Sequence, residues 1–154
     1  MALGSKWEHF ILKGEFPERK KIVTGLTLKQ VNQKPVPGMH SIYEELWHTA
    51  RWAHIVVNRD SEAEKEFQGA GVFPAKPAAS QEEWDKLVYE FSGLLDKMMD
   101  FTKNTEQLKA EQEPGWTLED FVDSLVIHNT YHLGKIVAVR QMIGAWPPKE
   151  TDKK

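Results

Sequence analysis

His128-Asn129-Thr130-Tyr131-His132 stands in the middle of the last strongly periodic stretch of the chain, between residues 117 and 143. Apolar residues recur there in steps of three and four, as expected on one face of a helix. They are Leu118, Phe121, Leu125, Ile136, Val139 and Ile143. His128 and His132 fall in register with this stripe, and two side chains four residues apart lie one above the other on a helix. The stretch therefore predicts an amphipathic helix whose two imidazoles face the interior.

Both ends of this helix carry their own signals. Thr117-Leu-Glu-Asp120 has the outline of a capping box, with a hydroxyl at the N-cap and an acid three residues later. Trp116 and Phe121 are placed to form a hydrophobic staple around that cap. Gly144 offers the C-terminal stop.

The histidine pair has two interpretations. In the first, both are core histidines that form hydrogen bonds to neighbouring side chains or backbone, because a buried polar atom needs a partner. In the second, one divalent metal ion satisfies both inward nitrogens. The spacing alone does not decide between them, and a metal site would need a third ligand from elsewhere in the chain.

The helix that could supply the third ligand is predicted to begin at Ser41-Ile-Tyr-Glu44, a full capping box. One of its faces carries Ile42, Leu46, Ala50, Ala53 and Val57, and a second carries Glu44, His48, Trp52, Ile55 and Arg59. A helix that is apolar on more than one side packs on more than one side. His48 could therefore be buried, but periodicity does not favour it over His54 or His40.

The remaining pattern completes an all-α, four-helix bundle. Ser80-Gln-Glu-Glu83 is read as another full capping box, and the four long helices are predicted near 3–25 (broken around Pro17), 41–59, 81–103 and 117–143. Residues 103–114 are expected to fray, and no strand pattern is found. The whole chain, 1–154, is expected to be one domain.

Residues 60–79 are expected to lack regular structure, because Gly69, Gly71, Pro74 and Pro77 interrupt them. A connection of this length can run along a whole helix, so the second and third helices are expected to be parallel, in up-down-down-up order. The favoured interpretation is a crossover that covers core, and the alternative is a lid over a site.

Composition excludes several functions. The chain has 154 residues, a formal net charge of −3 and no cysteine. The charge gives no general attraction to nucleic acid. No apolar run approaches the roughly 18 residues of a membrane span, and the N-terminus lacks a signal-peptide pattern, so a cytoplasmic protein is expected. Any reacting thiol must arrive with a cofactor or substrate.

Several pieces of sequence together resemble the DinB/YfiT-like family of metalloenzymes, where DinB denotes damage-inducible helical-bundle proteins and not the DNA polymerase of that name. They are Leu26-Thr-Leu-Lys-Gln30, Pro35-Val-Pro-Gly-Met-His-Ser-Ile42, Glu45-Leu-Trp-His48, His128-Asn-Thr-Tyr-His-Leu-Gly-Lys-Ile136 and Arg140-Gln-Met-Ile-Gly-Ala-Trp-Pro-Pro148. They span nearly the whole chain in the family's order and spacing.

The resemblance implies a four-helix bundle that holds a divalent metal ion through three histidines. Carried over by motif, these ligands are His48, His128 and His132, with zinc or nickel expected. Asn129 departs from the Asp often found after the first histidine of the pair. That change removes a carboxylate beside the site but no ligand.

Three histidines leave a coordination position open, as in catalytic zinc sites. The resemblance points to transfer or isomerisation of a small-molecule substrate with a low-molecular-weight thiol such as bacillithiol, mycothiol or glutathione. The alternatives are a metal-dependent hydrolase and a non-catalytic metal-binding stress-response protein. Arg51, Arg59 and Lys135 are candidates to hold the carboxylates of a thiol cofactor, although the favoured interpretation of each is a solvated surface charge.

A homodimer is also expected. The family commonly pairs, and Trp47 and His54 lie away from both stripes of their helix. Pairing of identical helical surfaces is the commonest way to cover such faces.

Overall fold

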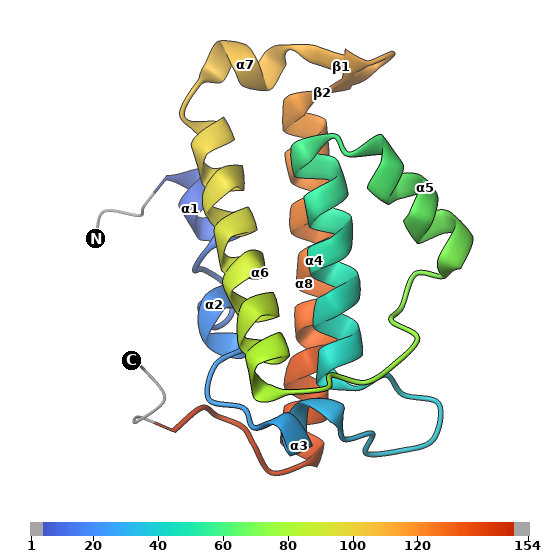
Figure 1. The fold of residues 1–154 in the computed structure, drawn as a ribbon. Coiled ribbons are helices and arrows are strands. Elements are labelled where there is room, and N and C mark those ends of the chain that lie inside the picture. Colours follow the sequence, from blue (N-terminus) through green and yellow to red (C-terminus); the bar gives the residue numbers. More distant parts are fainter. Residues whose placement is uncertain (1–4, 150–154) are drawn as a thin grey trace.

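Three long helices form the body of the protein in a computed structural model that describes residues 5–149. They are α4 (Ile42–Asn58), α6 (Gln81–Thr102) and α8 (Leu118–Met142), each within one residue of its predicted bounds. In Figure 1, α4 and α6 run in the same direction and α8 returns in the opposite one. Helix α4 lies against both α6 and α8, so its side chains face two neighbours.

The capping signals explain where α4 and α8 begin. At each N-terminus a hydroxyl accepts a hydrogen bond from the backbone three residues later, and that residue's carboxylate accepts one from the N-cap backbone. These pairs are Ser41 with Glu44 and Thr117 with Asp120, which confirms both predicted capping boxes. The Trp116 and Phe121 rings lie 5.4 Å apart, as the staple requires. At the other end of α8, Gly144 adopts a positive φ of 72°.

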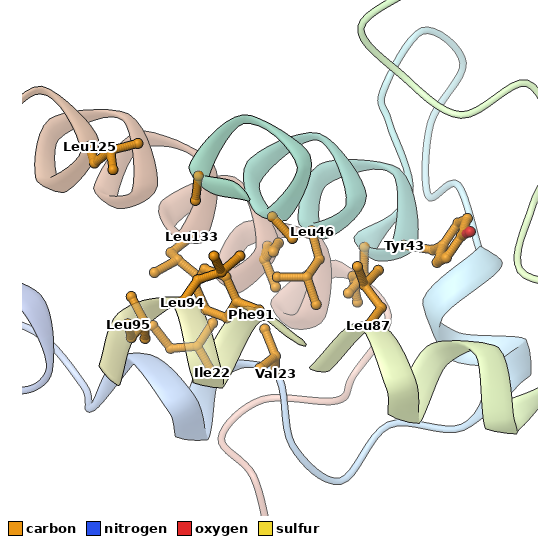
Figure 2. Close-up of a cluster of buried hydrophobic side chains, with 14 of the residues drawn as sticks. Ile22, Val23, Tyr43, Leu46, Leu87, Phe91, Leu94, Leu95, Leu125 and Leu133 are labelled. Atoms are coloured by element: carbon orange, nitrogen blue, oxygen red, sulfur yellow. The ribbon is translucent and has the colours of Figure 1, made fainter. Parts of the chain in front are cut away.

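The core lies where these three helices meet the N-terminal segment. Figure 2 shows Leu46 of α4, Phe91 and Leu95 of α6 and Leu133 of α8 in one apolar cluster with Ile22. Each of these five side chains is no more than 2% exposed. Burial of this kind stabilises a fold by about 1.5–3 kcal/mol per large apolar side chain, so the cluster holds α4 and α8 in fixed register.

The N-terminal segment differs from the long broken helix predicted for residues 3–25. It contains only α1 (Lys6–Ile11) and α2 (Arg19–Ile22), and Leu3 lies outside the described residues. The break is wider than Pro17 alone predicts because Gly14 and Phe16 form an isolated bridge around Glu15, whose φ is positive. The buried Arg19 guanidinium donates to the backbone carbonyl oxygens freed by this break, those of His9, Phe10, Gly14, Phe16 and Pro17.

Two connections contain structure that the sequence did not predict. Residues 60–79 were expected to be irregular, yet Asp60 caps helix α5 (Ser61–Ala70) by accepting from the Ala63 amide. Residues 103–114 contain α7 (Thr105–Lys109) and strand β1 (Glu111–Glu113), which pairs antiparallel with β2 (Trp116–Thr117). The short helix α3 (Leu28–Asn32), before the connector to α4, does carry a sequence signal, because Thr27 and Gln30 form a complete capping box at its start.

The capping box predicted at Ser80 is only half formed. The Ser80 hydroxyl accepts from the Glu83 amide, but the Glu83 carboxylate turns to the Ala79 amide and the Tyr43 hydroxyl. It thereby ties the start of α6 to α4. Among residues 5–149, no helix is long and apolar enough to cross a membrane.

Candidate metal centre

His48, His128 and His132 converge between α4 and α8. Each offers one ring nitrogen, and the three nitrogens lie within 4.8 Å of one another. The imidazoles on α8 have centroids 4.6 Å apart, and the His48 ring lies 5.1 Å from His128 and 4.4 Å from His132. The α4–α8 packing therefore brings together residues 80 positions apart in the chain.

His48 Nε2 faces His128 Nε2 at 3.1 Å. Adjacent ligands on a tetrahedral zinc ion with bonds of about 2.0–2.1 Å lie about 3.3–3.4 Å apart. The observed separation is therefore close to that of two nitrogens sharing one ion. Because both atoms carry lone pairs in the ligand form, a shared cation would remove their mutual repulsion.

The far nitrogens of two of these rings have acceptors that fix the tautomer. His48 Nδ1 lies 2.8 Å from the carbonyl oxygen of Val72, and His132 Nδ1 lies 2.6 Å from Glu45 Oε2. A carbonyl and a carboxylate accept hydrogen bonds, so Nδ1 carries the proton in both rings. Nε2 is then left as a lone-pair donor, directed at the cluster. A metal-ligating histidine almost always has such an outer partner.

His128 is the ring without such a partner. Its Nδ1 and the neighbouring Asn129 Oδ1 are buried and lack hydrogen-bond partners within residues 5–149. The pKa of His128 is lowered to about 4. Burial is the largest cause, and the nearby His132 and His48 rings act in the same direction. Burial is also the largest influence on His48 and lowers its pKa. Both rings are therefore neutral near pH 7, which is the form that binds a metal.

Glu45 is the residue of this site that sequence reasoning missed. Its side chain is 3% exposed, with Oε2 on His132 Nδ1 and Oε1 lying 3.3 Å from His40 Nδ1 and 3.7 Å from Lys135 Nζ. Burial acts to raise the pKa of Glu45, but the His132 hydrogen bond and the charges of Lys135 and His40 bring it below the ordinary value. Glu45 therefore stays ionised beneath the histidines. Its place one turn before His48 on α4 was the available signal.

The connection between α4 and α6 also reaches the site. Phe73 stacks on His40 at 3.7 Å and on His48 at 4.7 Å between ring centroids, and Phe67 of α5 lies 5.5 Å from His48. Together with the Val72 carbonyl, these contacts cover one side of His48. The crossover therefore packs on the body of the protein and also covers residues of the site.

Of the three cationic residues considered as contacts for a thiol cofactor, two lie away from the histidine cluster and one lies beside it. Arg51 pairs with Glu66 of α5 at 2.8 Å, and Arg59 donates to the Gln112 side chain at 2.6 Å. Both are therefore engaged in holding connections to α4. Lys135 alone lies beside the histidine cluster, near Glu45 and 4.7 Å from the centre of the Tyr131 ring.

Of the histidines that periodicity could not separate, only His48 joins the cluster. His54 faces Asp60 and Asn58 on the surface, and His40 touches Glu45 and Phe73 behind the ligands. The motif-based choice of His48 thus agrees with the observed convergence.

A family model described as the DinB superfamily matches residues 19–136, which include all three histidines. No curated protein and no solved structure matches the chain.

Proposed function

The chain belongs to the DinB superfamily, and from this premise we propose that it is a divalent-metal-dependent transferase that uses a low-molecular-weight thiol. His48, His128 and His132 would hold one ion, with zinc or nickel favoured because imidazole nitrogen suits both. The observation that carries the proposal is the convergence of one ring nitrogen from each of three histidines, two of which have their Nδ1 hydrogen-bonded to groups outside the cluster.

Three protein ligands leave a position for substrate or cofactor. A bound divalent ion supplies Lewis acidity, which lowers the pKa of a thiol placed there from its usual value of about 8.5. The thiol proton would be released to solvent. The sulfur would then form a bond to an electrophilic carbon, while the bond to the leaving group would break and that group would depart with the electron pair. Because the chain has no cysteine, the sulfur must come from the cofactor.

The protein's own residues would position these partners. Glu45 orients His132 through Nδ1 and keeps its Nε2 available. Lys135 is partly exposed beside the cluster, and its ammonium could bind a carboxylate of bacillithiol, mycothiol or glutathione. Intracellular thiols of this kind fit a cytoplasmic protein, which we propose for this chain.

The test is product formation with each of the three thiols and a panel of small electrophiles. Zinc- or nickel-loaded protein should accelerate conjugation, whereas apo protein and the His48→Ala variant should not. The sulfur in the product should be that of the added thiol.

A different outcome would contradict thiol transfer. If metal-loaded protein gives only the uncatalysed rate with every thiol, and thiol addition leaves the spectrum of the cobalt-substituted protein unchanged, thiol transfer is wrong. Hydrolysis by metal-activated water, or metal binding without catalysis, would then replace it.

A further inference from the structure

A cavity lies at the end of the bundle where α4 ends and α8 begins. Figure 1 shows α7 and the β1–β2 hairpin extending across this end, with α5 starting next to them. The cavity has a volume of about 650 Å³, within the range of sites for small molecules. Its walls come from every one of these elements and from the last turn of α6.

Half-buried apolar side chains form much of the wall of this cavity. They are Trp52 and Val56 of α4, Phe101 of α6, and Leu118 and Phe121 of α8. Four of these five also pack against the main core, which fixes their positions. Removing apolar surface from water is favourable in free energy. An apolar molecule that covers these side chains would therefore bind favourably.

The charged side chains at the rim already have partners within the protein. Arg59 donates to the Gln112 side chain at 2.6 Å and lies 3.9 Å from Glu113. Glu64 accepts from Gln68 of the same helix. The rim therefore holds one cation and two carboxylates, and presents no excess positive charge that would select an anion. The rim charge therefore disfavours an anion, and the apolar wall favours an uncharged ligand.

Trp52 connects the cavity to the metal centre. It lies one turn after His48 on α4, and its ring centroid is 6.4 Å from that of His128. The same indole lines the cavity. The Trp52 ring therefore forms a wall between a molecule in the cavity and the His128 side of the histidine cluster.

We propose that this cavity binds the uncharged apolar body of the electrophilic substrate, with Trp52 as the wall it shares with the metal centre. Ligand binding at this site is inferred from the cavity alone. The role of the site in substrate choice rests, in addition, on the proposed thiol transfer.

Direct binding tests the site without any reaction. The neutral dye N-phenyl-1-naphthylamine should bind the full chain saturably, with one dye per protein. Val56→Trp, which fills the cavity, should weaken that binding at least tenfold, while the matched Val36→Trp at an exposed position should not. Metal content and circular dichroism should be the same in all three proteins. If Val56→Trp fails to fold, Val56→Phe serves with the same expectation in smaller degree.

Two outcomes would overturn the site: dye binding that does not saturate, and dye binding that is equal in the wild type and in the folded cavity-filling variant. Either would show that the apolar wall does not receive a ligand.

The catalytic role is tested with a series of n-alkyl halides of increasing length. In the wild type, kcat/KM should rise with each methylene, by up to about fourfold. In Val56→Trp the rise should disappear, while in the matched Val36→Trp it should persist as in the wild type. A rise that persists in Val56→Trp would place the alkyl chain elsewhere. Failure of thiol transfer itself would appear as no metal-dependent reaction even with the shortest halide, while the dye experiment would still decide the site.

Discussion

Glu45 Oε2 lies 2.6 Å from His132 Nδ1, and both side chains are almost fully buried. The short contact joins an ionised carboxylate on α4 to the ring that α8 contributes to the metal centre. One interaction therefore sets the tautomer of His132 and also the approach of the two helices.

Changing Glu45 should weaken metal binding while leaving all three histidines in place. We expect Glu45→Gln to lower zinc affinity about tenfold, since the amide oxygen can still accept from Nδ1, and Glu45→Ala to lower it up to about 100-fold. Competition with a chromophoric chelator measures both values. Glu90→Gln, an exposed acid on α6, is the matched control. Wild-type affinity in Glu45→Ala would show that the carboxylate does not support the ligand.

Removing a proposed ligand should remove the metal. His132→Ala should lose most of the bound ion, because two imidazoles hold a divalent ion far less tightly than three. His9→Ala should retain it, since His9 lies on α1 and its ring faces Glu15 in the following turn. Metal analysis of the two purified variants makes the comparison, and equal content would refute the assignment of His132.

The protein without metal should lose stability as the pH falls from about 6.5 towards about 4. The pKa of His128 is lowered from 6.5 to about 4 in the folded state, so the unfolded chain binds more protons in that window. His48 acts in the same direction. Thermal unfolding of chelator-treated protein across this range gives the slope.

His128→Gln cannot gain this proton and supplies the control for the pH experiment. Its melting temperature should depend less on pH in the same window. An identical slope in the variant and the wild type would assign the effect to other groups.

Phe73 should hold the crossover on the metal centre. Its ring stacks between His40 and His48, so Phe73→Ala should cost about 2 kcal/mol of unfolding free energy, less than the 3–5 kcal/mol typical of a fully buried ring. Amide exchange in residues 71–73 should also accelerate. Val72→Ala is the control, because it keeps the carbonyl that His48 uses and trims a side chain that is 41% exposed. Unchanged exchange in Phe73→Ala would count against this role.

Pairing in solution stays a prediction, and the structure changes which surface is expected to carry it. Trp47 is covered within the chain by Phe67 of α5, whereas Ile127 and Tyr131 of α8 are 71% and 61% exposed. We expect a homodimer through this face of α8, which Ile127→Asp should convert to monomer. Sedimentation measures the mass, with Tyr89→Asp on α6 as the control. A wild-type mass of only 17.7 kDa at micromolar concentration would exclude pairing.

The long helices were predictable because their signals are local. Hydroxyl caps, acids three residues later and apolar residues in steps of three and four marked α4, α6 and α8 to within a residue. Helix α5 was missed because Gly69, Gly71, Pro74 and Pro77 were taken together as one irregular segment. Only Gly69 lies inside the helix, near its end, and Gly71 ends it with a φ of 103°.

The site was predictable only in part, for the opposite reason. The His128–His132 pair is visible as a local pattern, but His48 becomes distinct from His54 only through motif resemblance or through the packing of α4 on α8. The Glu45–His132 contact spans 87 residues, and Arg19 gathers carbonyls from a loop that it helps to shape. The periodicity of a single helix does not predict side-chain contacts between residues this far apart in the chain.

The 80-residue separation of His48 from His128 makes the metal centre a potential cross-link between distant parts of the chain. An ion held by both residues would close that loop as a disulfide does, in a chain that has no cysteine. In the chain-entropy account of cross-links, a loop of this length is worth about 4–5 kcal/mol. Metal supply would then govern how long each molecule survives heat and proteolysis, independently of any turnover at the same ion.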